Sequence, residues 1–198
     1  GGTGSYLCEG NGWQYTFFVP HAVYGLLELF GGDKPFLERL NQFFVNNDSM
    51  GEEASADITG LIGQYAHGNE PSHHISYMYA YAGQQWKTAE KVRYIMDEFY
   101  KDTPDGIIGN EDCGQMSAWY ILSSMGFYQM NPADGVYVFG SPRFDKMSVK
   151  VRGGKTFTVE AENNSKENIY IQKVFLNGKP YKKTYITYDD IINGSTLK

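Results

Sequence analysis

Apolar residues recur at helical spacing through the first two thirds of the chain. In residues 21–30 the steps between them are three, one and three residues, which places one apolar set on one helix face: Val23, Leu26, Leu27 and Phe30. Pro20 suits the first turn of this helix, and Gly31 with Gly32 predicts its end. We therefore expect an amphipathic helix here that buries one side.

The same spacing predicts four more helices. Asp33 is expected to cap the next one, with Pro35 in its first turn. Its apolar face consists of Phe36, Leu37, Leu40, Phe43 and Phe44. The other three are expected over residues 72–82, 88–100 and 115–125. Gly126 is a natural C-terminal stop for the last of them.

Beyond residue 131 the pattern changes to short alternating runs that predict antiparallel strands. The expected strands cover residues 136–139, 147–151, 156–161 and 169–175. Asn177-Gly178 is a strong hairpin signal, and a further strand is expected to begin after the turn at Asn193-Gly194. The fold class is therefore mainly α over residues 1–131, followed by a β-rich C-terminal segment over residues 132–198.

Composition narrows the functional classes. A chain of 198 residues with 41% hydrophobic residues can bury a substantial core. The net charge of -6, with acids and bases mixed, offers no basic stripe for a phosphate backbone, so nucleic acid is not an expected partner. No apolar run approaches the roughly 20 residues that span a bilayer, and the glycine-rich start resembles no signal peptide. Cys8 and Cys113 are too few for a disulfide scaffold, and we expect two buried thiols, with a bridge between them left open.

Acidic residues stand among glycine, amide and aromatic neighbours in segments 8–15, 67–74 and 104–115. Helix capping explains an acid such as Asp112 before Gln115. All the same, each segment leads into a predicted helix, so the loops could open at one end of a helical barrel. Glycoside hydrolysis needs one protonated and one ionised carboxyl group, and oxygen-rich Asn, Glu and Asp side chains also suit a hard cation such as calcium.

The longest of these motifs read EGNGWQYTFFVPH, GQYAHGNEPSHHISYMYAYAG and PDGIIGNEDCGQMSAWYILSSMGFYQMNP. They resemble the C-terminal signature of glycoside hydrolase family 92, the calcium-dependent α-mannosidases, over almost the whole chain. The resemblance implies the second half of an (α/α)6 barrel, followed by antiparallel strands. It also implies that an N-terminal β-sandwich and the first half of the barrel belong to the same enzyme, and that the enzyme works in the periplasm, at the surface or outside a bacterial cell.

Carried over by motif, the resemblance makes Glu9 the general acid and Asp112 the general base of an inverting exo-α-mannosidase. Asn69 and Glu70 fall where the ligands of Ca²⁺ are expected. The expected substrate contacts are Trp13, His67, His73 and Glu111. The implied substrates are terminal α-mannosides of N-glycans or mannans, with α-1,2 linkages among the candidates. The fragment alone is expected to be inactive, because half of the pocket walls would be missing.

This sequence departs from the family pattern at two places. Asn110-Glu111-Asp112 stands where some relatives have Asp-x-Asp, so Glu111 can replace the first aspartate only in part. Gly68 follows His67 where relatives that prefer α-1,2 linkages often have Glu, which leaves the linkage open.

Other interpretations remain. The histidines do not favour zinc, because adjacent His73 and His74 would point about 100° apart on a helix, and no His-x-x-x-His pair exists. His74 and His21 can be structural. A different hydrolase or a phosphorylase on an (α/α)6 toroid, and a non-catalytic carbohydrate-binding domain, stay as alternative functions.

Overall fold

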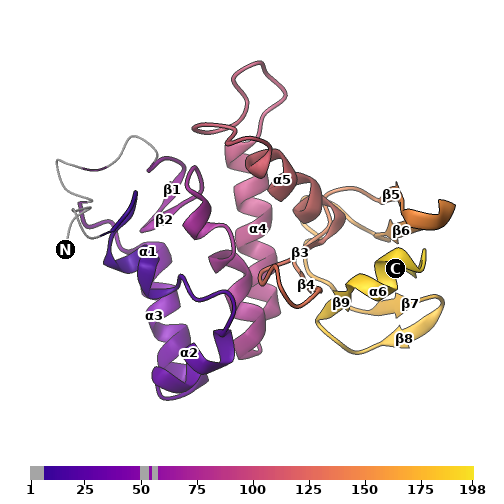
Figure 1. The fold of residues 1–198 in the computed structure, drawn as a ribbon, viewed down its shortest axis with the longest axis horizontal. Coiled ribbons are helices and arrows are strands. Elements are labelled where there is room, and N and C mark those ends of the chain that lie inside the picture. The colour runs from indigo at the N-terminus through magenta and orange to yellow at the C-terminus, as the bar shows by residue number, and fades with distance from the viewer. Residues whose placement is uncertain (1–6, 50–53, 55–57) are drawn as a thin grey trace.

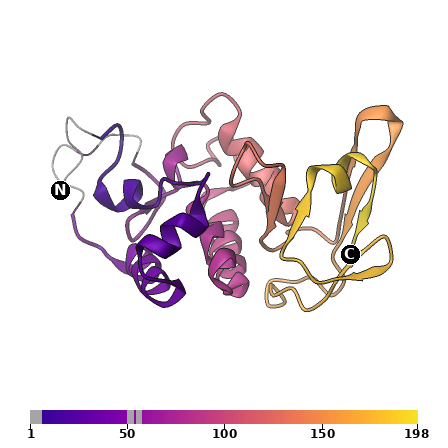
Figure 2. The ribbon, with the colours of Figure 1, turned by 60° about the horizontal axis from the view of Figure 1, so that its bottom comes forward.

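The structure is a computed structural model that describes residues 7–49, 54 and 58–198. Helices occupy the first part of the chain, α4 crosses the middle, and the strands of the C-terminal part lie at the other end (Figure 1). A view turned by 60° keeps this division (Figure 2). Among the described residues, no helix has both the length and the apolar character that a membrane crossing requires.

The N-terminal helices are α1 (Gly12–Thr16), α2 (Val23–Leu29) and α3 (Asp33–Val45). The first was not predicted. It begins with a capping box in which the Asn11 side chain accepts from the amide of Gln14, and the Gln14 side chain accepts from the amide of Asn11 at 2.6 Å.

Two details of the predicted helix starts are wrong. Pro20 lies ahead of α2, not in its first turn, because the chain makes a turn over residues 20–21 before the helix begins. Asp33 is the first residue of α3, and Gly32 occupies the cap without a side-chain hydrogen bond.

The long segment between α3 and α4 contains more structure than the sequence predicts. Strands β1 (Leu61–Ile62) and β2 (Tyr65–Ala66) pair antiparallel, and a 3-10 turn, η1 (Glu70–Ser72), follows. The helix expected over 72–82 forms as the 3-10 helix η2 (Ile75–Ala82), which ends at Gly83 with φ of 75°. Because eight mostly apolar residues fit a period of 3.0 as well as 3.6, the sequence pattern could not distinguish the two helices.

Helix α4 (Gln85–Phe99) starts three residues before the predicted position, and α5 (Gln115–Met125) has the predicted bounds. Gly126, with φ of 101°, ends α5 in the left-handed conformation that glycine adopts without strain. Helix η2 packs against α2, α3 and α4. The first hydrophobic core surrounds it, with side chains that are fully buried: Phe17, Phe36, Leu40, Phe43, Tyr65, Ile75, Tyr77, Met78, Val92, Ile95 and Trp119.

The β-rich part contains two sheets. The strands are β3 (Phe127–Tyr128), β4 (Val136–Phe139), β5 (Lys146–Lys150), β6 (Thr156–Glu160), β7 (Val174–Leu176), β8 (Lys179–Tyr181), β9 (Tyr185–Thr187) and β10 (Thr196–Leu197). One sheet has the order β3-β4-β9 and the other β5-β6-β10-β7-β8. A 3-10 turn, η3 (Arg152–Gly154), joins β5 to β6, and a short helix, α6 (Tyr188–Ile192), precedes β10.

The strand predictions are confirmed in part. The hairpin at Asn177-Gly178 forms between β7 and β8, with φ of 51° and 77° at its two turn residues. The strand expected after Gly194 is β10. The predicted antiparallel pairing is confirmed for the other strand pairs of this part, whereas β10 pairs parallel with β6. Of the strand expected over 169–175, only its end is regular, in β7.

A second hydrophobic core lies under these sheets and consists of Met125, Phe127, Phe139, Phe157, Val159, Ile186 and Leu197. Arg93 of α4 connects the helical part to this region. Its guanidinium group donates to the Ser141 hydroxyl at 3.0 Å, to the Pro142 carbonyl at 2.6 Å and to the Asn164 side chain. Strand β3 lies before residue 131 and pairs with β4, which lies after it. The predicted division into a helical part that ends at residue 131 and a β-rich segment that begins at residue 132 stays a prediction.

Candidate functional site

The loop that carries Glu9 leads directly into α1 and exposes the Glu9 side chain. Glu9 has φ of 50°, a conformation that non-glycine residues rarely adopt. Hydrogen bonds to main-chain carbonyls hold the loop: the Tyr15 hydroxyl donates to the carbonyl of Cys8 at 2.6 Å, and the Asn69 side-chain amide donates to the carbonyl of Glu9. The second bond joins this loop to the next candidate segment, 60 residues away.

Asn69 and Glu70 lie where the β1–β2 hairpin passes into η1. Asn69 is buried and Glu70 is exposed. The Asn69 amide nitrogen faces the Glu9 carbonyl, so the Asn69 side-chain oxygen, which lies in the same plane, points in a different direction. The segment is further fixed because the Gly68 amide donates to the Thr59 carbonyl at 3.0 Å.

The loop over residues 101–114 approaches the same segment closely. A Cβ atom at Gly109 would lie 2.5 Å from the Thr59 hydroxyl oxygen and 3.6 Å from the Gly68 Cα atom, so only glycine fits there without a shift. Asp112, Cys113 and Gly114 then have φ of 56°, 56° and 100° just before α5 begins. Figure 1 shows this loop above α4 and α5, on the side where β1 and β2 lie.

The three acid-bearing loops are therefore linked to one another, whereas convergence of their carboxyl groups on one pocket stays a prediction. Asn69 connects the first two, and Gly68 with Gly109 brings the second and third together. A third link lies at the start of α5, where the Gln115 side-chain amide donates to His73 at 3.0 Å. A cavity of about 550 Å³ lies elsewhere, in the β-rich part, and no predicted site residue lines it.

Glu111 caps α5. One of its carboxylate oxygens accepts from the Gly114 amide at 2.6 Å, and the other accepts from the Ser117 hydroxyl at 2.7 Å and the Ser117 amide at 3.3 Å. The hydrogen bond from the Ser117 hydroxyl lowers the pKa of Glu111 most, and that from the Gly114 amide adds to it. The capping that the sequence suggested for Asp112 is thus supplied by the preceding acid. A contact between Glu111 and substrate stays a prediction.

His67 and His73 are buried, and protein groups hold both ring nitrogens of each. The Tyr100 hydroxyl donates to the Met116 carbonyl at 2.9 Å, so it accepts from His67 Nε2 at 2.7 Å. His67 Nδ1 then accepts from the Tyr65 hydroxyl at 2.8 Å. In the same way His73 Nε2 donates to the His67 carbonyl at 2.8 Å. The sugar contacts predicted for these histidines stay predictions.

Burial keeps this cluster uncharged. It lowers the pKa of His67 well below the usual value and lowers the pKa of His73, against a raising effect of the His67 carbonyl. It also raises the pKa of the Tyr65 and Tyr100 hydroxyls. The cluster therefore acts as a neutral hydrogen-bonded support beneath the loops, a role that no pattern in the sequence revealed for Tyr65 or Tyr100.

Trp13 is half-buried, and the Arg39 guanidinium carbon lies 3.5 Å from the centroid of its ring. This cation–π contact covers one face of the indole. Arg39 comes from α3, far along the chain, and its spacing in the sequence gave no sign of the contact. Stacking of Trp13 on a sugar stays a prediction for the other face.

The thiol expectations are corrected. Cys8 and Cys113 are free and both are exposed, so they neither form a bridge nor lie in a core. Each stands in a loop beside an acid of the candidate site, and such loops lie at the surface.

The next feature is the set of side chains that could bind a metal ion. Among the described residues, no three side chains of His, Cys, Asp or Glu gather as metal ligands do. Asn69 and Glu70 offer amide and carboxylate oxygens, the donor type that Ca²⁺ prefers. Because Ca²⁺ takes about six to eight oxygen ligands, these two residues fit as a part of a coordination shell.

The chain is similar to proteins of one family along nearly its whole length. A family model described as the glycosyl hydrolase family 92 catalytic domain matches residues 2–198. A secreted glycosidase of Arthroderma benhamiae, whose function is uncharacterized, is 35% identical over 189 residues, which are 94% of this chain and 22% of that protein.

Solved structures give the same result. A family GH92 α-mannosidase from Bacteroides thetaiotaomicron, in complex with mannoimidazole, superposes with a TM-score of 0.88 at 42% identity and covers 95% of this chain. A family GH92 inverting mannosidase from the same organism has a TM-score of 0.82 at 39% identity over 96% of the chain. The chain spans 25% and 27% of the length of these two structures. This chain therefore belongs to glycosyl hydrolase family 92 and is part of its catalytic domain.

Proposed function

We propose that this chain supplies the catalytic groups of a calcium-dependent, inverting exo-α-mannosidase. The observation that carries the proposal is the junction of the three acid-bearing loops, formed by the Asn69 bond to the Glu9 carbonyl and the close approach of Gly109 to Gly68. Similarity to α-mannosidases, one of them described as inverting, supports the reaction class. We further propose that the described helices form part of an (α/α)6 barrel, completed by other segments of the same enzyme.

Two carboxyl groups carry out the two proton transfers of the reaction. Glu9 is the general acid and gives its proton to the glycosidic oxygen as the bond from that oxygen to the anomeric carbon breaks. Asp112 is the general base and takes a proton from the water that attacks the anomeric carbon from the opposite face. The configuration inverts in this single displacement, which requires the two carboxyl groups to stand about 6.5–9.5 Å apart.

Asn69 and Glu70 would hold Ca²⁺, which as a Lewis acid orients the sugar hydroxyls and favours a distorted ring. The protein's own part is to fix these donors. Because the Asn69 nitrogen is bound to the Glu9 loop, loss of that bond would move an oxygen ligand and the general acid together. Beneath them, the bond between Gln115 and His73 ties the start of α5, and with it Asp112, to the same framework.

The proposed substrates are terminal α-mannosides of N-glycans or mannans. Hydrolysis of substrates with different linkages, α-1,2 among them, would measure the linkage preference. Secretion is proposed from the relative that is called a secreted glycosidase. Half of the barrel and a β-sandwich would complete the pocket, so the 198-residue chain alone should turn over little or no mannoside.

The acid and base assignments are tested in the enzyme that contains this chain with the rest of its barrel. Glu9→Gln and Asp112→Asn should each lower kcat by about a hundredfold or more, whereas Glu98→Gln, at an exposed position of α4, should leave kcat unchanged. Azide should partly restore turnover to Asp112→Ala and give a mannosyl azide product. Full activity of Glu9→Gln would exclude the assignment of the acid, and dependence of cleavage on phosphate would favour a phosphorylase.

Calcium is tested separately. Chelation should abolish turnover, and added Ca²⁺ should restore it and raise the thermal midpoint. Glu70→Gln should weaken the calcium effect on that midpoint, because a charged ligand becomes a neutral one. A midpoint that responds to neither Ca²⁺ nor mannose would favour a domain without catalytic function.

A further inference from the structure

Gln115, the first residue of α5, carries a side-chain amide that protein groups hold at its nitrogen. The Nε2 atom donates to His73 Nδ1 at 3.0 Å and to the Tyr128 hydroxyl at 3.1 Å. An amide nitrogen has two hydrogens, so these two acceptors use both of them. His73 precedes η2 and Tyr128 belongs to β3, so two distant segments fix the nitrogen of Gln115.

The hydrogen bonds of His73 decide which way round this amide lies. His73 Nε2 donates to the His67 carbonyl at 2.8 Å, so in the neutral ring Nδ1 carries no hydrogen and acts as an acceptor. An amide turned the other way round would place its oxygen against this acceptor. The His73 ring thus directs the Gln115 nitrogen toward itself and leaves the amide oxygen, Oε1, for another partner.

The Oε1 atom is available to a ligand. Among the residues that the structure describes, no protein group donates to it, since both hydrogen bonds of this side chain use the nitrogen. Gln115 is half-buried, and Oε1 is not one of the buried side-chain atoms that lack a hydrogen bond, so solvent reaches it. Gln115 therefore offers an acceptor of fixed direction to a hydroxyl group or a water molecule.

The amide of Gln115 lies between two segments that carry candidate site residues. On one side, the Gln115 main-chain amide donates to the Asp112 carbonyl at 3.2 Å, which closes a tight turn from the candidate base to α5. On the other side, the Gln115 side chain contacts His73, which donates to the carbonyl of His67 just before Gly68.

Burial indicates that the side chains of Asp112 and Gln115 face the same side of this turn. Both residues are half-buried, whereas Glu111 and Cys113, on either side of Asp112, are exposed. Glu111 also uses both of its carboxylate oxygens to accept hydrogen bonds from the first turn of α5. Gln115 is therefore better placed than Glu111 to act together with Asp112.

An attacking water needs two acceptors to be fully oriented. In the inverting reaction proposed above, one hydrogen of the water goes to the base while its oxygen bonds to the anomeric carbon. A water that is held by this one hydrogen bond can turn about it, so its lone pair has no fixed direction. A second acceptor fixes the other hydrogen, and with it the lone pair, which lowers the entropic cost of reaching the transition state.

We propose that Gln115 Oε1 is this second acceptor, an inference that rests on the proposed mannosidase function. Asp112 takes one hydrogen of the water as the oxygen bonds to the anomeric carbon, and Glu9 gives its proton to the departing glycosidic oxygen. The other hydrogen stays on the attacking oxygen, bonded to Oε1, and becomes part of the anomeric hydroxyl of the product. His73 and Tyr128 are positioning residues, because they hold the nitrogen of Gln115.

Exchange of water for azide tests this role in the enzyme that contains this chain with the rest of its barrel. Gln115→Met should lower kcat for hydrolysis about tenfold with little change in KM, because methionine has a similar length and no amide oxygen. Azide has no hydrogen to donate. In the Asp112→Ala background, Gln115→Met should therefore leave the rate of mannosyl azide formation unchanged.

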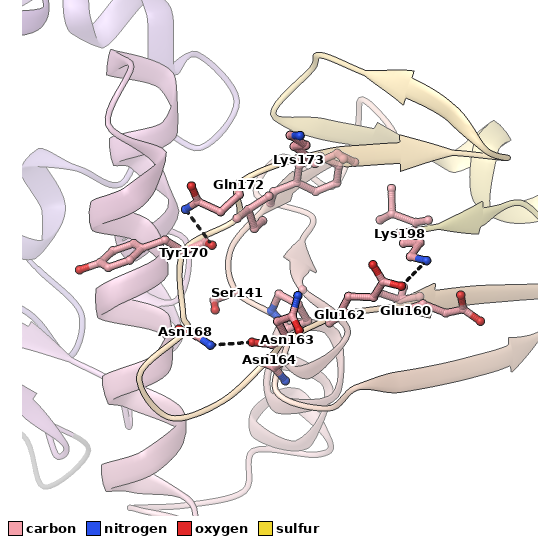
Figure 3. A pocket seen from close by; sticks show the side chains of 18 of the residues that line it. Ser141, Glu160, Glu162, Asn163, Asn164, Asn168, Tyr170, Gln172, Lys173 and Lys198 are labelled. Atoms are coloured by element: carbon pink, nitrogen blue, oxygen red, sulfur yellow. Dashed lines mark hydrogen bonds and ion pairs between the residues drawn. The ribbon is translucent and has the colours of Figure 1, made fainter.

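Two further variants separate orientation of the water from a merely structural role. Gln115→Glu keeps an acceptor for the water and should hydrolyse mannosides faster than Gln115→Met. The matched control is Gln172→Met, which should leave kcat unchanged. Gln172 is exposed in the β-rich part, where its side-chain amide donates to the Tyr170 carbonyl at 3.3 Å (Figure 3).

Each alternative has a result of its own. Equal losses of hydrolysis and of azide reaction in Gln115→Met would overturn the proposal, because Gln115 would then contact the sugar or support the fold. Unchanged hydrolysis in Gln115→Met, or equal rates in Gln115→Met and Gln115→Glu, would also overturn it. Unchanged hydrolysis in Asp112→Ala would instead overturn the assignment of the base, and the second acceptor with it.

Discussion

At the scale of single residues, burial decides the charge of the histidines. His74 is almost fully buried, its Nε2 lies 2.7 Å from the Phe17 carbonyl, and burial lowers its pKa to about 4. His67 and His73 have lowered pKa values for the same reason. The sequence predicted that His67 and His73 lie near the candidate site, but not that protein groups hold their ring nitrogens.

These pKa shifts predict a loss of stability in acid. Below pH 6.5 the unfolded chain binds protons at histidines that the folded chain keeps neutral, so the free energy of unfolding falls as the pH drops toward 4. Each such histidine contributes a slope of about 1.4 kcal/mol per pH unit within its window. Urea unfolding at pH 7, 6 and 5 measures this slope. His74→Gln should reduce it, because it removes a buried histidine whose pKa the fold lowers. An unchanged slope in His74→Gln would contradict the prediction.

At the scale of elements, helix α5 lies between the loop that carries the candidate base, Asp112, and the first strand of the three-stranded sheet, β3. Glu111 caps its first turn, and Gly126 ends it in a left-handed conformation beside Pro142. The bounds of α5 were predictable from the sequence because local signals set both ends. The residue that caps α5 was not predictable from the sequence. Glu111 and Asp112 are adjacent, and only the path of the loop decides which carboxylate accepts hydrogen bonds from the first amides of the helix.

Substitution of Gly126 tests the helix end. Gly126→Ala should destabilise the protein by about 1–2 kcal/mol, because alanine is strained at φ of 101° and its Cβ would lie 3.2 Å from Pro142. Gly25→Ala is the matched control within α2, where the nearest side-chain atom is 4.0 Å away, and should stabilise by about 0.5–1 kcal/mol. Denaturant midpoints measure both. A neutral Gly126→Ala would show that the helix end can relax.

At the scale of the whole molecule, two hydrophobic cores are connected through α4 and α5. Arg93 reaches from α4 to Ser141 and Pro142, between β4 and β5, and to Asn164, between β6 and β7. All three tryptophans, Trp13, Trp86 and Trp119, lie in the helical part, so their fluorescence reports on that part alone. The connection can therefore be measured as agreement between probes.

Removal of the Arg93 contacts should loosen this connection. Arg93→Met keeps the apolar stem but leaves the Pro142 and Asn164 acceptors without their donor, which should lower the free energy of unfolding by about 1–3 kcal/mol. Tryptophan fluorescence and amide signals of β5 and β6 should then give separate denaturant midpoints, whereas they coincide in the natural chain. Arg39→Met removes the contact with Trp13 and the 3.5 Å hydrogen bond to Gln42, both within the helical part, so it is the control and should keep the midpoints together. Coincident midpoints in Arg93→Met would contradict the prediction.

The sequence by itself determined the features that depend on local spacing. These include the apolar faces of the helices, the end of α5 at Gly126, the turn at Asn177-Gly178 and the motifs that carry the family resemblance. Each is set by neighbours within a few residues, so periodicity and turn chemistry are sufficient to predict it.

Only the tertiary structure decided the features that join distant segments. The parallel pairing of Thr196 with Thr158, the bond from Asn69 to Glu9 and the cover of Arg39 on Trp13 each connect residues that no local pattern relates. Exposure of the thiols and the neutral state of the histidines likewise depend on which surfaces the fold brings together. Such contacts form when the hydrophobic cores pack and bring distant segments together, and their geometry follows from the packing of the whole chain.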